Sequence, residues 1–311
     1  TIIRTKKSEK STVEPHLICH CSEIAEPMMM HSAREVARRQ FFRQLQASVL
    51  AAAVVCATPK ALPFSLVSAV DDPVAAVLRD VDWEASPPFS KGDFRRLDET
   101  DDGIFYETPR LVYHVDDAAV AATTSYYGRL FTQVAQRQKV EQLAVLDLCS
   151  SWVSHYPQAG PPTGRVAGLG MNAAELQQNP QLTEWVVADL NKVPCRLPYA
   201  DNSFDVVTCT VSIDYLTQPL AVMGEVARVL RPGGSVAVVF SNRLFFSKAV
   251  AVWTGKDDLE HIYTVGSYMH YGAPGILSDP EAIDLTPRST SRKPRDPLYA
   301  VVATKLPVNQ G

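Results

Sequence analysis

The stretch that decides the fold is VARVLRPGGSVAVVFSN, residues 226–242. Its first residues end an amphipathic segment, 217–230, which has Pro219 near its first turn, as is typical of a helix. Arg-Pro-Gly-Gly then stops the helix, and residues 235–240 form a short, continuous apolar run. Such a run is typical of a buried strand in a parallel sheet. The stretch therefore predicts a helix, a tight turn and a buried strand in succession.

Apolar runs of the same kind recur on both sides of this stretch. They lie at residues 143–148, 165–169, 185–188, 204–208 and 298–304. Segments compatible with helices separate them, and an amphipathic helix that Asp116-Asp117 can cap precedes the first run. This alternation predicts an α/β fold of the Rossmann-like, doubly wound type, with a mainly parallel sheet and helices on both faces.

Composition limits the classes of partner and of metal site. The chain has 311 residues, a formal net charge of -4 and a pI near 6.0. It therefore lacks the sequence-wide basic charge that binding to nucleic acids or membrane surfaces requires, and we expect neither as a partner. Its six cysteines do not suggest a disulfide framework. The run His16-Leu-Ile-Cys-His-Cys21 has no second ligand pair, so we predict no metal site.

Residues 1–62 have the pattern of a targeting leader. Four arginines between 34 and 43 precede an apolar stretch, 47–57, that is shorter than the roughly 20 residues a bilayer span requires. Arg38-Arg39-Gln-Phe-Phe resembles a twin-arginine signal, and the Lys- and Ser-rich start is similar to a plastid transit peptide. We expect a chloroplast protein, in the thylakoid lumen, with no membrane span in the mature chain. A bacterial periplasmic signal and a basic amphipathic helix without a targeting role are the alternatives.

The rest of the chain divides into an extension and a main domain. Residues 63–115 show no clear period, but their aromatic side chains favour an extension that packs on the core and can cover the active site. Residues 116–308 contain all the predicted strands and form the main domain.

Several motifs together carry a resemblance to a known family. LPYADNSFDVV (197–207) and the stretch 226–242 resemble the second half of the type 11 class I methyltransferases, which use S-adenosylmethionine (SAM). VLDLCSSWVSHYP (145–157) and GLGMNAAEL (168–176) extend the resemblance to about two thirds of the chain, and indicate a plant and algal plastid branch with a degenerate glycine loop. The resemblance implies a seven-stranded sheet, SAM as the cofactor and a small-molecule methyl acceptor.

The first departure from the family lies in the loop after residues 143–148. Asp147 is retained, where it can hold the loop or reach the amino group of SAM, but Cys149, Ser151 and Val153 replace glycines that let the backbone approach the cofactor. Ser150 and Ser151 are expected to cap a following helix and to donate to the SAM carboxylate.

The second departure lies after residues 165–169, where the family places an acid for the ribose hydroxyls and this chain has Gly170. Asn172 is then expected to supply one amide contact, and Met171 to pack on the adenine. Asp189, with Leu190 beside it, stands where the family binds the adenine amino group; an N-cap on a following turn is the alternative role for Asp189. Thr210 and Val211 are predicted to line the cofactor.

Catalytic roles are weakly specified because methyl transfer depends mainly on positioning and desolvation. Asp214 and Tyr215 follow the run 204–208 and are candidates for facing the acceptor, Asp214 as a base; a capping Asp beside a packed Tyr is the plainer interpretation. His270 is a further candidate near the strand ends, with a structural role as its alternative.

Two functions of different class compete. The first is a SAM-dependent methyltransferase acting on a small molecule, and the second is a catalytically inactive methyltransferase fold that serves as a binding or assembly partner. The missing glycines motivate the second. A nicotinamide dehydrogenase is not supported, because no G-x-G-x-x-G motif follows residues 143–148.

Overall fold

The computed structural model describes residues 72–158, 163–288 and 295–307. By internal contacts the chain divides into two units, residues 1–41 and 42–311, and every described residue belongs to the second. The expectations for the leader, residues 1–62, therefore lie outside the described residues. No helix in the described ranges is long and apolar enough to cross a membrane.

A seven-stranded sheet forms the centre of the domain, with the order β3-β2-β1-β4-β5-β7-β6. Strands β1 to β5 pair in parallel, whereas β7 is antiparallel to both β5 and β6. The predicted mainly parallel, doubly wound sheet is confirmed. The strands are β1 (Leu143–Leu148), β2 (Thr163–Gly170), β3 (Glu184–Val187), β4 (Phe204–Thr210), β5 (Leu230–Phe240), β6 (Glu281–Asp284) and β7 (Tyr299–Thr304).

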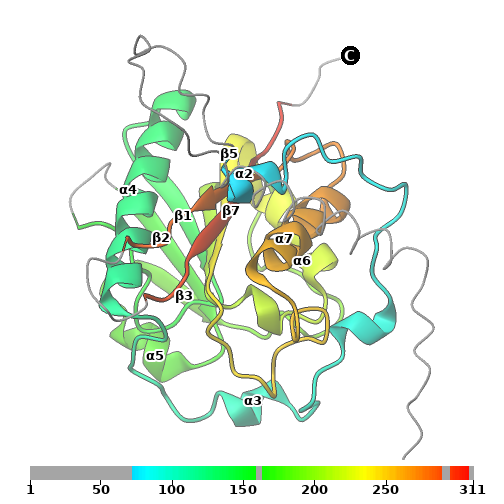
Figure 1. Cartoon of the computed structure of the whole chain (residues 1–311). Coiled ribbons are helices and arrows are strands. Elements are labelled where there is room, and N and C mark those ends of the chain that lie inside the picture. The colour runs from blue at the N-terminus through cyan, green and yellow to red at the C-terminus, as the bar shows by residue number, and fades with distance from the viewer. Residues whose placement is uncertain (1–71, 159–162, 289–294, 308–311) are drawn as a thin grey trace, which may run out of the picture. The chain divides into compact units, whose positions relative to one another are not determined.

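Helices cover both faces of this sheet (Figure 1). The long helix α4 packs on one face through a core that includes Tyr127 and Phe131, and α6 and α7 pack on the other face beside α2. Asp116 caps α4, accepting from the Ala119 amide at 2.8 Å, as the sequence predicts. The helices are α2 (Pro73–Ala76), α3 (Asp102–Phe105), α4 (Asp117–Gln138), α5 (Ala173–Gln178), α6 (Pro219–Val229) and α7 (Asp258–Gly272), with 3-10 turns η1 (Lys91–Phe94) and η2 (Ile213–Tyr215).

The Arg-Pro-Gly-Gly segment before the central part of β5 packs closely against the neighbouring strand. A Cβ on Gly234 would lie 2.8 Å from the backbone oxygen of Asp205, so no side chain fits there. Arg231 donates twice to the buried Asp205 carboxylate, at 2.8 and 2.9 Å. Asp205 also accepts from the Ala144 amide in β1, at 2.8 Å. The segment thus ties β5 to β4 and β1, and the structure includes it in β5 itself.

The connection from β1 to β2 differs from the expectation. Residues 149–158 contain no helix in the structure, so the prediction that Ser150 and Ser151 cap a following helix is wrong. The loop instead folds back on β2, where the Ser150 amide donates to the Leu169 oxygen at 2.8 Å. The described part of this connection, residues 149–158, therefore brings loop side chains, rather than a helix end, to the carboxyl ends of the strands.

The described part of the extension, residues 72–115, runs along the segment that follows β5. Arg96 forms an isolated antiparallel bridge with Val250, and the Asp98 amide donates to the Ser247 oxygen at 2.8 Å. Further along, the backbone amide of Arg110 donates to the Glu175 carboxylate at 2.7 Å, in α5. These contacts place the extension beside the ends of β1 to β5.

Candidate cofactor and substrate site

A cavity of about 330 Å³ opens at the carboxyl ends of the parallel strands. Its floor comes from the ends of β1, β2 and β4 and from the segment after β3, and its walls come from residues of the extension and of the segment 243–245. Ligands of doubly wound sheets bind at this edge, and the volume falls in the range of small-molecule sites. The fold and the cavity define a Rossmann-like ligand-binding domain.

The loop after β1 keeps a glycine-like backbone although it has no glycine. Cys149, which borders the cavity, has φ of 54°, the left-handed conformation that side chains adopt at a cost of roughly 1–2 kcal/mol. Cys149 therefore occupies the first glycine position of the family in the conformation that glycine favours. Although the sequence departs from the family here, the backbone of this residue keeps a conformation typical of glycine, and the residue borders the cavity.

Asp147 holds this loop in place. Its buried carboxylate accepts from the hydroxyls of Ser150 and Ser154, both at 2.7 Å, and from Thr208 at 3.3 Å. Burial raises the pKa of Asp147 to about 6, against the opposing effect of these three hydrogen bonds. Of the two predicted roles for Asp147, holding the loop is the one that its contacts show.

The structure explains why position 170, at the end of β2, is a glycine. A Cβ at this position would lie 2.0 Å from the backbone oxygen of Ser150, far inside any real contact. The loop after β1 therefore excludes every side chain from position 170, including the acid that the family has there. Asn172 does not take over that role with a free amide, because its side chain donates to the backbone oxygens of Tyr106 and Glu107 at 2.8 and 3.0 Å and caps α5.

Asp189 borders the cavity after β3 together with the buried Leu190, and Met171 borders it beside Gly170. The Asp189 carboxylate accepts from the Asn191 amide at 2.8 Å, and no other hydrogen bond to it occurs within the described residues. This contact caps the turn that follows, which is the alternative role predicted for Asp189. One carboxylate oxygen stays available for a ligand.

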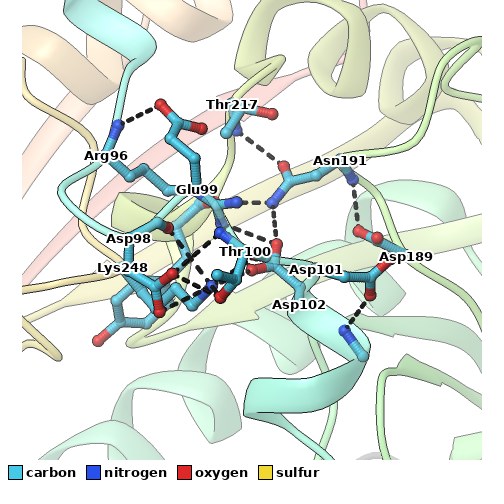
Figure 2. A network of polar contacts seen from close by, with 12 residues as sticks. Arg96, Asp98, Glu99, Thr100, Asp101, Asp102, Asp189, Asn191, Thr217 and Lys248 are labelled. Atoms are coloured by element: carbon cyan, nitrogen blue, oxygen red, sulfur yellow. Dashed lines mark hydrogen bonds and ion pairs between the residues drawn. The ribbon is translucent and has the colours of Figure 1, made fainter.

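A buried polar network connects Asp189 to the extension (Figure 2). The side-chain amide of Asn191 donates to Asp102 at 2.9 Å and to the Tyr215 oxygen at 3.0 Å. Asp102 also accepts twice from Arg96, at 2.7 and 2.8 Å, and lies 3.2 Å from the fully buried ammonium of Lys248. Burial opposes ionisation of Asp102, but the hydrogen bonds from Arg96 and Asn191 lower its pKa below the usual value. The network fixes the Asn191 turn, and with it Asp189, against the extension.

At the end of β4 the predicted cofactor residues border the cavity. The Thr210 hydroxyl is 2.6 Å from that of Tyr127 in α4. Val211 has φ of 45°, which is a strained conformation for a β-branched residue, and its amide donates to the Val239 oxygen at 2.7 Å. Strain of this kind concentrates at functional sites.

The three candidate catalytic residues separate. Tyr215 borders the cavity, and its hydroxyl accepts from the Phe245 amide at 2.9 Å. Asp214 is buried and does not border the cavity; burial raises the pKa of Asp214 to about 8. His270 is not brought to the cavity at all, since it stacks on Trp83 with ring centroids 4.4 Å apart.

The sequence favoured an aromatic extension that packs on the core and covers the site, but it did not assign individual aromatic and basic side chains to the cavity wall. The extension contributes Tyr106, Arg110, Tyr113 and His114, and the β1–β2 loop contributes Trp152 and His155. His155 has φ of 57° and a buried Nδ1 without a hydrogen-bond partner. Burial, assisted by the nearby His114, lowers the pKa of His155 to about 4, so its imidazole is neutral at pH 7. The density of aromatic residues between 105 and 114 was the available signal.

In the parts of the chain that the structure describes, no three His, Cys, Asp or Glu side chains group as metal ligands would. Asp189, Leu190, Met171, Thr210 and Val211 are the predicted cofactor residues that lie together on the cavity surface with Cys149, Ser150, Ser151, Gly170 and Asn172.

Comparison with known proteins identifies the family. A family model described as a methyltransferase domain matches residues 129–238. The ubiquinone/menaquinone biosynthesis C-methyltransferase UbiE of Cupriavidus metallidurans is 30% identical over 189 residues, which are 56% of this chain and 71% of that protein. The chain belongs to the class I SAM-dependent methyltransferases.

Other relatives match over shorter stretches. The UbiE protein of Ruegeria sp. is 36% identical over 75 residues, and this match covers 24% of the present chain and 28% of that protein. The chain thus spans less than a third of the length of that curated relative. A solved SAM-dependent methyltransferase from Mesorhizobium loti is 16% identical with a TM-score of 0.40, covering 59% of this chain and 98% of its own.

Proposed function

We propose that this protein binds SAM in the cavity and transfers the methyl group to a small-molecule acceptor. The observation that carries the proposal is the open cavity of about 330 Å³ in which Asp189 presents a carboxylate beside the ends of the parallel strands. Membership of the methyltransferase family supports the same function. An inactive binding protein would not need an open cavity at this edge.

The residues present fit the cofactor at the adenine end. Asp189 would accept from the adenine amino group, and Leu190 and Met171 offer the apolar surface on which a flat ring packs. The ribose would meet no acid at position 170, because the Ser150 oxygen fills the space of a side chain there. SAM, when bound, supplies a methyl group on a sulfonium.

The chain's own contribution to the reaction is positioning and exclusion of water. Tyr106 and Phe245 enter the wall from two distant segments, and both stack edge-on with Phe105, at 5.0 and 5.4 Å. Burial raises the pKa of Tyr215, so its hydroxyl stays protonated beside the cavity. Tyr106, Phe245 and Tyr215 thus form a largely apolar wall with an uncharged, hydrogen-bonded hydroxyl on Tyr215, and this wall can orient an acceptor.

We infer that the acceptor has a planar ring. Aromatic side chains line the wall, and the UbiE relatives are named for ubiquinone and menaquinone biosynthesis. Two imidazoles, His114 and His155, border the cavity, and burial lowers the pKa of each. A neutral imidazole can accept a hydrogen bond from a ring hydroxyl, so these side chains can orient such an acceptor, while their lowered pKa makes them weak bases.

The test is a calorimetric titration of the full chain with SAM. We expect micromolar binding that falls at least tenfold in Asp189→Ala. The matched control is Asp284→Ala, since Asp284 ends strand β6 and its carboxylate also accepts from the amide two residues on, at 2.8 Å, but it lies outside the cavity. Absence of binding up to millimolar SAM in folded protein would refute the proposal and leave the binding-partner alternative.

We also propose, from the sequence of residues 1–62, that the chain is delivered to the chloroplast and on to the thylakoid lumen. The full chain with a fluorescent protein at its C-terminus should accumulate in the lumen of plant chloroplasts. Changing Arg38 and Arg39 together to lysine should stop it in the stroma. A cytosolic signal from the unaltered chain would contradict the proposal.

A further inference from the structure

Arg110 carries a guanidinium on the cavity wall that is held by aromatic rings rather than by an acid. Its Cζ lies 4.5 Å from the centre of the Phe105 ring and 5.4 Å from that of Phe245. One of its terminal nitrogens donates to the Phe105 backbone oxygen at 2.9 Å. A guanidinium has five N–H donors, so this single bond leaves most of them for a ligand.

The acids around Arg110 are already occupied. Each carboxylate oxygen of Glu175 already accepts one hydrogen bond, Oε1 from the Arg110 backbone amide at 2.7 Å and Oε2 from the Ser151 hydroxyl at 2.6 Å. Asp102 is paired with Arg96 at 2.7 Å and with Lys248 at 3.2 Å. Within the described residues, no carboxylate forms an ion pair with the Arg110 side chain.

The other cation of the cavity differs in this respect. Arg243 borders the same cavity, but its guanidinium is paired with Asp296 at 2.8 Å. Of the two guanidinium groups on the wall, only that of Arg110 lacks an anionic partner among the described residues. A fixed, unpaired guanidinium is suited to a carboxylate, which it can bind through two parallel hydrogen bonds.

The position of Arg110 relates it to the cofactor. Its backbone is joined through Glu175 to Ser151, in the loop after β1, so the residue stands over that loop. SAM has one carboxylate, at the end of the molecule away from the adenine. With the adenine at Asp189, this end reaches the part of the cavity that the β1 loop and Arg110 border.

We propose that Arg110 binds the carboxylate of SAM, in place of the helix that the chain lacks between residues 149 and 158. The proposal rests on the proposed function, since it requires that SAM occupies the cavity. The proposal gives the extension a direct part in cofactor binding. Arg110, which would pair with the SAM carboxylate, lies outside residues 129–238, the part of the chain that matches the methyltransferase-domain model.

The experiment compares two ligands in calorimetric titrations of the full chain. One is SAM, and the other is decarboxylated SAM, which keeps the adenosine, the sulfonium and the amine. Arg110→Met should weaken SAM by about ten- to a hundredfold, as expected for hydrogen bonds to a charged group. It should leave the affinity for decarboxylated SAM within about twofold. Arg110→Lys should lie between, because an ammonium retains the charge but not the paired donors.

Arg165→Met is the matched control, since its guanidinium also lies over a phenylalanine ring, 4.6 Å from the centre of Phe204, but outside the cavity, and it should alter neither affinity by more than about twofold. If Arg110→Met binds SAM as tightly as the unaltered chain does, the inference is wrong and the proposed function stands. Equal weakening of both ligands would show an effect on the wall rather than on the carboxylate, and would also overturn it. If the unaltered chain binds neither ligand, the proposed function itself fails.

Discussion

Replacing Gly170 by alanine should destabilise the protein. The added Cβ would lie 2.0 Å from the Ser150 backbone oxygen, whereas real Cβ atoms keep at least 3.0 Å from such atoms, so the loop or the strand must move by about 1 Å. The oxygen cannot rotate away, because the Ser150 amide and hydroxyl are both hydrogen-bonded, at 2.8 and 2.7 Å. Overpacking of this kind costs typically about 1–3 kcal/mol, and a rigid obstacle favours the upper value.

Thermal unfolding followed by circular dichroism measures this cost. A loss of about 3 kcal/mol lowers the Tm of a domain of this size by about 6–12 °C. Gly164→Ala is the control in the same strand, since its Cβ would meet only the flexible Gln142 side chain. Gly170→Asp restores the family's acid, yet we expect it to be at least as unstable as Gly170→Ala and to bind SAM no better. Equal Tm values for Gly170→Ala and Gly164→Ala would refute the reasoning.

Further predictions concern the buried charges and the cavity thiol. Lys248→Met should lower the free energy of unfolding by about 3–5 kcal/mol in chemical denaturation, because the fully buried ammonium has acidic partners, while Lys91→Met at the surface should change little. Asp214 has its pKa raised to about 8 by burial, so the folded chain keeps a proton that the unfolded chain releases above its ordinary value of 3.8. The free energy of unfolding should therefore fall as pH rises from about 4 to 8, and Asp214→Asn should flatten that slope in denaturation series at several pH values; an unchanged slope would contradict the burial effect. SAM should slow maleimide labelling of Cys149 several-fold, measured by peptide mass spectrometry, and should leave Cys195 unaffected, since only Cys149 borders the cavity.

Sequence reasoning located most of the fold because strands and helices with strong patterns are local features. The predicted helix at 217–230 appears as α6 (Pro219–Val229), and six apolar runs correspond to six of the seven strands. The seventh, β6 (Glu281–Asp284), alternates exposed and buried residues over only four positions, so it lacks the continuous apolar run of the others. The helix expected after β1 came from the family resemblance, although Pro157, Pro161 and Pro162 in that segment oppose a helix.

The site was harder to predict because its geometry depends on contacts between distant segments. The family resemblance placed Asp189 and Thr210 at the strand ends, and the structure has both on the cavity surface. It could not show that Gly170 is required by the Ser150 oxygen, since that contact exists only when the loop folds back on β2. Nor could it show Arg110 on the wall, because the extension has no periodic pattern to fix its path.

The buried network around Asp102 has a consequence for how this protein can diverge from its relatives. The matched family segment, residues 129–238, carries β1 to β4, most of β5 and the cavity floor at the ends of these strands, whereas the remaining wall comes from residues 102–115 and 243–245. Lys248 and Asp102 fasten those two outer segments to each other with buried charges. The residues that shape the acceptor side of the cavity therefore lie largely outside the segment that matches the family model. These two segments therefore depend on each other. Substitutions that reshape the cavity wall for another substrate must keep the buried ion pair between Asp102 and Lys248.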